Sequence, residues 1–312
     1  MRRLTLLLPP LLRIRDPGRL LTLSRWRAKG DQLVPIAPGR DTVLRACFEF
    51  TGKDIPYAAL TRLRDGGDAA ASCWVRADPA FVLADAVTLR MLACGTLDLS
   101  PAESGELARP LRLLFGDAGF PLEAAHPQRW YLRCPKGARL PRFAPPDAVL
   151  GDDLGAHLPQ GDNERQWRHL LNEAQVILHN HPVNARRVER NLTPANSLWF
   201  WGAGTLPDWV RSPFDHVHSR DQTLLALAQL GQIGAGSPVA DVGSGAGRVL
   251  LDLADQRDGA ELEAKFLEPI GERLRRRECG EVEVRFEDGG AFSTRPAHRW
   301  RFWRPVRPLA GE

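Results

Sequence analysis

Histidines and cysteines are the residues of this chain with the most direct route to metal or redox chemistry. Two histidine pairs alternate with one other residue, His179 with His181 and His216 with His218. Alternate histidines on a strand can share a metal ion, but neither pair has a nearby cysteine or carboxylates at a recurring ligand spacing. The five cysteines are irregularly spaced and include no C-x-x-C pair. We therefore predict hydrogen-bonded or solvated histidines, no metal, no cofactor and a reducing cytoplasmic location.

A glycine-rich segment from Ala240 to Gly247 reads A-D-V-G-S-G-A-G. Glycines between a strand and a helix let the backbone approach a cofactor, and this segment resembles the first motif of S-adenosylmethionine-dependent methyltransferases. The chain ends at residue 312, which leaves too little sequence for the remaining βα units of that fold. We favour a plain turn between a strand at 239–242 and a helix at 249–254, with a methyltransferase as an alternative.

The segment from Arg295 to Arg304 interleaves arginines with Trp300, Phe302 and Trp303. Such a mixture can stack on single-stranded nucleic acid. Its alternation also suits a final two-faced strand, and acidic residues precede it in the neighbouring hairpin. We expect a structural role and no nucleic-acid partner.

Composition limits the class of protein. The chain has 312 residues, 43% hydrophobic and 26% charged, with a formal net charge of +4. These values exclude a disordered acidic chain and a concentrated nucleic-acid binder. The basic residues are mostly arginines, whose planar guanidinium groups can donate two parallel hydrogen bonds to a phosphate or carboxylate ligand. No apolar run is long enough to span a bilayer, and prolines 9 and 10 interrupt the first one, so we expect a buried first strand rather than a signal peptide, and no membrane partner.

Hydrophobic periodicity predicts an α/β protein with mixed sheets and flanking helices. The expected strands lie at 4–8, 73–75, 129–134, 197–201 (buried on both faces and bounded by Gly202 and Gly204), 239–242, 282–286 and 299–303. The expected helices lie at 57–64, 101–114, 163–179 (capped by Asp162 and ended before Pro182), 223–230, 249–254 and 262–277. The turn at Asp288, Gly289 and Gly290 predicts a hairpin, and prolines 141, 145 and 146 predict a linker.

Several motifs follow one another in the middle of the chain. They are W-V-R-A-D-P at 74–79, R-W-Y-L-R at 129–133, P-P-D-A-V-L-G from 145, L-P-Q-G at 158–161, H-P-V-N at 181–184 and P-A-N-S-L-W-F-W-G at 194–202. This order resembles the archaeal-type, 2,3-bisphosphoglycerate-independent phosphoglycerate mutases. The W-R-F-W-R ending is similar to a shorter bacterial branch, the RpfE-type regulatory proteins.

The resemblance implies a truncated and degenerate form of the alkaline-phosphatase and phosphoglycerate-mutase architecture. In that superfamily, two divalent metals held by Asp and His clamp the oxygens of phosphoryl transfer, and a serine or threonine is the nucleophile. Here the first strand runs into Pro9 and Pro10 without an Asp-Gly, and no H-x-E or D-H-G block lies near the end of the chain. Asp147 and Ala148 replace the H-D of the family's P-P-H-D motif. The resemblance therefore implies a regulatory or binding protein without mutase catalysis.

We expect residues 1–70 and 207–312 to share one core domain, which ends in a hairpin, and residues 71–206 to form a central domain. For a small phosphorylated or carboxylated ligand, the candidate residues are Arg76, His181, Asn184, Arg187 and Asn196. Arginines would bind the anion, while the histidine and asparagines would orient it. The asparagines can equally serve only to satisfy turns. A protein partner stays open.

The alternative is an active phosphoglycerate mutase that interconverts 3-phosphoglycerate and 2-phosphoglycerate. It would need manganese, zinc or magnesium at a site rebuilt from Asp16, Asp215, His216 and His218.

Overall fold

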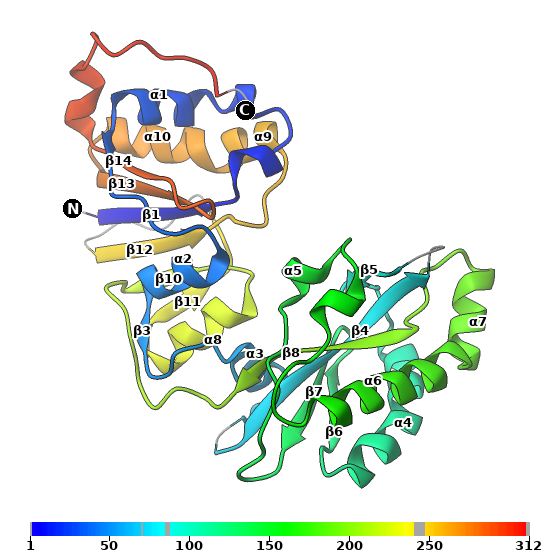
Figure 1. The fold of residues 1–312 in the computed structure, drawn as a ribbon. Coiled ribbons are helices and arrows are strands. Elements are labelled where there is room, and N and C mark those ends of the chain that lie inside the picture. The colour runs from blue at the N-terminus through cyan, green and yellow to red at the C-terminus, as the bar shows by residue number, and fades with distance from the viewer. Residues whose placement is uncertain (1, 70, 85–87, 240–246, 310–312) are drawn as a thin grey trace. The chain divides into compact units, whose positions relative to one another are not determined.

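The computed structural model describes residues 2–69, 71–84, 88–239 and 247–309, and it divides into two compact units (Figure 1). Unit 1 consists of Met1–Thr51 and Asp208–Glu312, and unit 2 of Gly52–Pro207. The central unit thus begins at Gly52, earlier than the boundary at residue 70 that the sequence suggested.

A seven-stranded sheet forms the centre of unit 1 within the described residues. In order across the sheet, its strands are β11 (Gly234–Gly236), β10 (His216–His218), β12 (Gly247–Asp252), β1 (Arg2–Leu8), β13 (Cys279–Phe286), β14 (Ala291–Thr294) and β2 (Asp31–Gln32). Adjacent strands from β11 to β13 are parallel to one another. Strand β14 is antiparallel to both of its neighbours, β13 and β2. A separate antiparallel pair joins β3 (Glu49–Phe50) to β9 (Val210–Arg211).

Helices cover the sheet of unit 1. They are α1 (Leu21–Lys29), α2 (Arg40–Cys47), α8 (Gln222–Leu230) and a continuous run of α9 (Gly259–Leu262), the π-helical segment η4 (Glu263–Leu267) and α10 (Glu268–Arg275). Short 3-10 turns lie at η1 (Leu11–Arg13), η2 (Pro17–Arg19) and η5 (Pro296–Trp300). Leu4, Leu6 and Leu8 alternate along β1 and share one core with Trp26 of α1 and Ile270 of α10. Burial of these apolar side chains holds α1 and α10 on one face of the sheet.

The expected helix at 249–254 is wrong, because this segment forms strand β12. Leucine and aspartate give no strong preference for a strand, but β12 lies between β1 and β10 and pairs with both. Val249, Leu250 and Leu251 are all buried, as a central strand covered on both faces requires. Position in the sheet therefore overrides the local propensity.

The expected final strand at 299–303 is also wrong. Residues 296–300 form η5, and Trp300, Phe302 and Trp303 are 65%, 85% and 66% exposed. The preceding hairpin is confirmed, since β13 and β14 pair in antiparallel register around Gly289 and Gly290. Of the expected strand at 239–242, residues 240–242 lie outside the described residues.

Unit 2 is built on the long strand β4 (Cys73–Ala84), which all its direct neighbours meet in antiparallel register. The other strands are β5 (Leu89–Cys94), β6 (Leu122–His126), β7 (Arg129–Cys134) and β8 (Ser197–Gly204), and β6 pairs with β7. The helices are α3 (Tyr57–Gly66), α4 (Pro101–Asp117), α5 (Pro146–Val149), the 3-10 turn η3 (Leu154–His157), α6 (Glu164–His179) and α7 (Pro182–Glu189). Phe115, Trp167 and Phe200 pack edge to face at its centre.

Local signals explain the helix ends of unit 2 only in part. Ser100 and Glu103 form a reciprocal capping box that starts α4. Asp162 does not cap α6, because Asn163 holds that position in a left-handed conformation without a side-chain cap. Pro182 is the first residue of α7, rather than only the end of the preceding helix.

The α/β class with mixed sheets and flanking helices is confirmed. Across the described ranges, no helix combines the length and apolar character that crossing a membrane would require.

Candidate functional site at the carboxyl edge of the parallel sheet

Polar residues gather where the parallel strands of unit 1 end. Asp252 is the last residue of β12, Glu287 follows β13, and Ser219 follows β10, with Asp221 two residues later. Open parallel sheets place ligands beyond the carboxyl ends of their strands. This edge is therefore the first place to look for a functional site.

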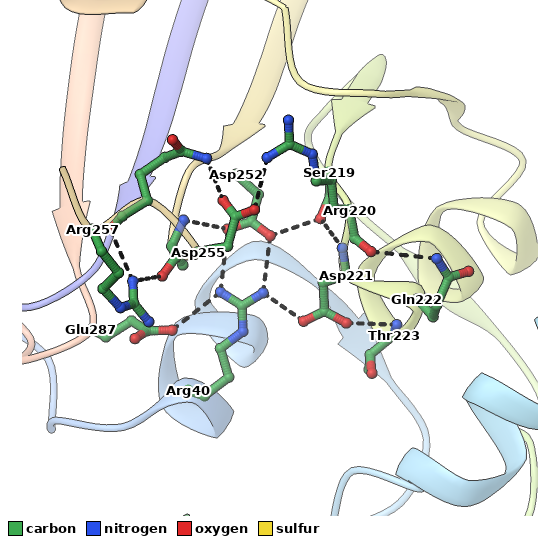
Figure 2. A network of polar contacts seen from close by, with 12 residues as sticks. Arg40, Ser219, Arg220, Asp221, Gln222, Thr223, Asp252, Asp255, Arg257 and Glu287 are labelled. Atoms are coloured by element: carbon green, nitrogen blue, oxygen red, sulfur yellow. Dashed lines mark hydrogen bonds and ion pairs between the residues drawn. The ribbon is translucent and has the colours of Figure 1, made fainter. Parts of the chain in front are cut away.

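Arg40, the first residue of α2, projects its guanidinium among three of these carboxylates (Figure 2). Its Nη2 lies 2.6 Å from Asp221 Oδ2 and 3.0 Å from Asp252 Oδ2. Its Nη1 lies 3.4 Å from Glu287 Oε1. The Arg40 side chain is 20% exposed and that of Asp252 only 6%. We call Arg40, Ser219, Asp221, Asp252 and Glu287 the Arg40 cluster.

Ser219 links the carboxylate of Asp252 to the backbone of Asp221, as Figure 2 shows. Its hydroxyl donates to Asp252 Oδ2 at 2.7 Å and accepts from the backbone N–H of Asp221 at 2.8 Å. Asp221 in turn caps α8 by accepting from the N–H of Thr223. Ser219 is only 2% exposed, and these bonds fix the position of its hydroxyl.

The electrostatics of the Arg40 cluster keep the guanidinium of Arg40 permanently charged. Burial opposes the charge of Arg40, but the carboxylates of Asp252 and Asp221 outweigh it and raise the pKa of the guanidinium. Burial also raises the pKa of Glu287, and Arg40 offsets this only in part. An arginine does not release its proton in a protein, so Arg40 cannot act as a general acid or base.

The Arg40 cluster does not fit the pair of divalent metals that the family resemblance implies. Its carboxylate oxygens are suitable ligands for magnesium or manganese, but three carboxylates already contact a fixed guanidinium. Among the residues that the structure describes, no three or more His, Cys, Asp or Glu side chains are grouped so as to hold a metal ion.

The four residues considered for a rebuilt metal site are not brought together. Asp16 comes after the carboxyl end of β1, whereas Asp215 precedes β10 and so lies at the opposite edge of the sheet. Asp215 accepts a hydrogen bond from the backbone of Arg248 at 2.7 Å. The rings of His216 and His218 stack on each other, with centroids 5.5 Å apart.

Arg76 lies in β4 of unit 2, and its guanidinium is already hydrogen-bonded within the chain. Its Nε and Nη2 donate to the two carboxylate oxygens of Asp78 at 2.8 and 2.7 Å. Its Nη1 donates to Thr61 Oγ1, and the guanidinium lies 5.0 Å from the ring centroid of Trp201. Trp201 donates its indole N–H to the same Asp78 carboxylate. The bidentate geometry expected for an anionic ligand is thus used within the chain.

Arg187 and Asn184 both lie on α7 and both are buried. Arg187 donates to Glu103 Oε1 at 3.1 Å and to the carbonyl oxygens of Thr193 and Leu97. Asn184 accepts from the N–H of Ala195 and donates to the carbonyl oxygens of Ala195 and Leu178. These bonds fasten the loop before β8 to α7.

His181 and Asn196 also have intramolecular partners. His181 caps α7, because its Nδ1 accepts from the N–H of Val183 at 3.2 Å. Asn196 makes a two-way bridge to the backbone N–H and carbonyl of Val82, each at 2.8 Å. A ligand role for the five candidate residues, Arg76, His181, Asn184, Arg187 and Asn196, stays a prediction. In the structure, each of them forms hydrogen bonds within unit 2 that stabilise its fold.

The glycine-rich motif at 240–247 lies outside the described residues except for Gly247. The strand β12 begins at that glycine, where the methyltransferase motif needs a helix. The structure therefore gives no support to a cofactor site of this kind.

Sequence reasoning missed the Arg40 cluster. Asp252 ends an apolar run that we assigned to a helix, and Glu287 follows an alternating strand. An acidic residue at the carboxyl end of each of two buried strands is the signal that could have found this edge of the sheet.

Comparisons with known proteins relate part of the chain to one family. No protein-family model matches it. A probable 2,3-bisphosphoglycerate-independent phosphoglycerate mutase of Geobacter sulfurreducens is 32% identical over 109 residues, which is 35% of this chain and 27% of that protein. The 2,3-bisphosphoglycerate-independent phosphoglycerate mutase of Methanothrix thermoacetophila is 34% identical over 86 residues, 28% of this chain and 21% of that protein.

The matches thus span about a quarter of the length of these curated relatives. Among solved structures, the cofactor-independent phosphoglycerate mutase from Thermoplasma acidophilum gives a TM-score of 0.45 at 19% identity, over 94% of this chain and 89% of that one. About a third of this chain is related in sequence to the cofactor-independent phosphoglycerate mutases.

Proposed function

We propose that this chain is a cytoplasmic regulatory or binding protein, derived from a cofactor-independent phosphoglycerate mutase and lacking mutase catalysis. The observation that carries the proposal is the guanidinium of Arg40 among Asp221, Asp252 and Glu287 at the carboxyl edge of the sheet. The sequence similarity to mutases supports the origin. The W-R-F-W-R ending supports placement with the RpfE-type regulatory branch.

The Arg40 cluster opposes two-metal chemistry for a physical reason. Two divalent ions stabilise phosphoryl transfer only if carboxylate and imidazole ligands are free to hold them. The guanidinium of Arg40, within 3.4 Å of all three carboxylates, occupies oxygens that a divalent ion would need as ligands. The nearby Ser219 is only 2% exposed, which opposes a role for its hydroxyl as the nucleophile.

The test is a mutase assay on the full chain. Conversion of 3-phosphoglycerate to 2-phosphoglycerate would be followed with manganese, cobalt, zinc and magnesium supplied in turn, after elemental analysis of the purified protein. We expect neither turnover nor bound metal. Turnover that a chelator abolishes would replace the proposal with the second candidate, an active mutase, which the similarity to named mutases favours.

Two further parts of the proposal concern partners. The ligand would be a small phosphorylated or carboxylated molecule, because the chain is rich in arginine and the related proteins are named for a phosphorylated substrate. A regulatory role would add a protein partner. Neither membrane nor nucleic acid enters the proposal.

A further inference from the structure

A pocket of about 230 Å³ opens in unit 1 against α1, α10 and η5. The helix α1 contributes Arg25, Trp26 and Lys29, and α10 contributes Leu274. The segment after β14 contributes His298 and Arg299. The pocket shares no residue with the Arg40 cluster.

The lining of this pocket is strongly basic. None of its lining residues in the described part of the chain is acidic. Two further arginines at its rim, Arg275 and Arg295, are paired with Glu272 and Glu281. The remaining three cations have no carboxylate partner among the described residues, and they are Arg25, Lys29 and Arg299.

The contacts of these three cations leave their charge available. Lys29 Nζ donates to the backbone carbonyl of Arg299 at 3.2 Å, which is a neutral acceptor. The guanidinium of Arg299 lies 4.9 Å from the ring centroid of Trp300. Arg25 is exposed on α1. Three uncompensated positive charges around one small pocket favour a multiply charged anion.

His298 is the one histidine in the lining of this pocket among the described residues. The side chain is buried, at 6% exposure, and its Nε2 lies 3.3 Å from Asp31 Oδ2. Its Nδ1 is buried and has no hydrogen-bond partner in the described structure. Burial and the charge of Arg301 lower the pKa of His298, so the ring is neutral near pH 7. The buried His298 therefore adds no positive charge to the lining, which comes from the arginines and Lys29.

The floor of the pocket is apolar. Trp26 and Leu274 both line it and both belong to the core of unit 1. Gly271 also lines the pocket, and a Cβ there would lie 3.2 Å from Thr22 Cγ2 and 3.6 Å from Trp26 Cζ2. Because Gly271 has no side chain, α1 and α10 can approach each other closely and the pocket beside them stays open.

We propose that this pocket binds a small organic phosphate monoester. Its phosphate group pairs with Arg25, Lys29 and Arg299, and its apolar body packs on the floor of the pocket. A phosphate monoester carries close to two negative charges near pH 7, which suits three cations better than a single carboxylate does. The site is separate from the Arg40 cluster, so this inference does not depend on whether the protein is a mutase.

Isothermal titration calorimetry of the full chain with phenyl phosphate tests the proposal. We expect binding at one site, weaker at high ionic strength because exposed charges are screened. Arg25→Ala should weaken it at least about tenfold, as the loss of a charge-assisted hydrogen bond does. Arg27→Ala is the matched control, because Arg27 is an exposed arginine of the same helix that does not line this pocket.

Three further probes make the result decisive. Inorganic phosphate lacks the apolar body and benzyl alcohol lacks the charge, so both should bind more weakly than phenyl phosphate. Benzoate that binds as tightly as phenyl phosphate would overturn the assignment to phosphate. No heat with phenyl phosphate, or an equal loss in Arg25→Ala and Arg27→Ala, would overturn the site itself. Near-ultraviolet circular dichroism would establish that both variants are folded.

Discussion

Arg40 is the residue on which the interpretation of the carboxyl edge depends. Its guanidinium neutralises part of the charge of Asp221, Asp252 and Glu287, which otherwise lie close together with little solvent. Removing one partner of a buried ion pair leaves the other charge uncompensated, and this costs far more than the loss of an exposed pair. Arg40 should therefore stabilise unit 1 as well as exclude a metal.

We expect Arg40→Ala to lower the free energy of unfolding by about 3 kcal/mol, measured by urea denaturation. Arg220→Ala is the control, because its pair with Asp255 is 60% and 47% exposed and should contribute less than about 1 kcal/mol. A loss in Arg40→Ala no larger than that in Arg220→Ala would show that the guanidinium is not essential to the cluster.

The same variant tests whether the guanidinium occupies the place of a cation. Without Arg40, three carboxylates remain that a divalent ion can neutralise, so added magnesium should restore part of the lost stability of Arg40→Ala. The parent protein should not respond, since its carboxylates are already paired. Equal stabilisation of both proteins, followed by urea denaturation in magnesium, would contradict this account.

At the residue scale, the sequence predicted motifs better than it predicted the site. The H-P-V-N segment and Arg187 stand out because they are close in sequence, and they fasten α7 to its surroundings. The Arg40 cluster joins α2 to the ends of three strands that lie far apart in the sequence. No spacing can reveal such a group, because only the sheet brings its members together.

In unit 2 as well, polar contacts join helices and strands that lie far apart in the sequence. Asp65 of α3 accepts from Arg129 Nε at 2.7 Å and Nη2 at 2.6 Å, and from the hydroxyl of Tyr131. Arg129 and Tyr131 both belong to β7, so this carboxylate fastens a helix to a strand. Burial opposes the charge of Asp65, but these hydrogen bonds outweigh it and lower the pKa of the carboxyl.

This shift gives a dependence of stability on pH. Because the pKa of Asp65 is lower in the folded state, its stabilisation is present above the unfolded value of about 4 and is lost as the pH falls through the folded pKa. Asp65→Asn should cost about 1–3 kcal/mol at neutral pH. The difference from the parent should shrink below pH of about 4, as measured by urea denaturation. Asp117→Asn, at an exposed position of α4, should show no such change with pH.

The hairpin between β13 and β14 should depend on one glycine and not on its neighbour. Gly289 has a φ of 93°, and a Cβ there would lie 2.0 Å from the carbonyl oxygen of Ile36. Gly289→Ala should therefore destabilise the protein by at least about 1 kcal/mol. At Gly290 the nearest atom is a side-chain oxygen of Asp288 at 3.3 Å, so Gly290→Ala should cost much less. Equal shifts of the thermal midpoint would contradict this reading of the turn.

At the element scale, prediction succeeded where local signals and burial agree. The D-G-G turn and the alternation of β13 both indicate the hairpin. The residues of β12 include Leu250, Leu251 and Asp252, which give no clear preference between a helix and a strand, and only pairing with β1 and β10 decides between them. The sequence of a short apolar run does not reveal which strands will pair with it.

Across the whole molecule, the chain builds unit 2 as an insertion into unit 1. The two pieces of unit 1 meet where β3 pairs with β9, and the backbone N–H of Asp208 donates to Thr51 Oγ1 at 2.8 Å. The sequence-based boundary at 70 left α3 outside the central domain, because its periodicity is weak. Its Ala58 and Ala59 nevertheless share a buried cluster with Trp74 and Tyr131 of the unit 2 sheet.

We therefore expect residues 52–207 to fold alone, since unit 2 is continuous in sequence and has its own core. Its urea unfolding should be cooperative and its near-ultraviolet circular dichroism should show fixed aromatic side chains. The shorter fragment 71–207 follows the sequence-based boundary and lacks α3, which removes Ala58 and Ala59 from the cluster with Trp74 and also removes Asp65 from β7. It should unfold at lower urea or fail to fold. Equal unfolding midpoints for the two fragments would place the domain boundary at 70 and leave α3 without a part in the stability of unit 2.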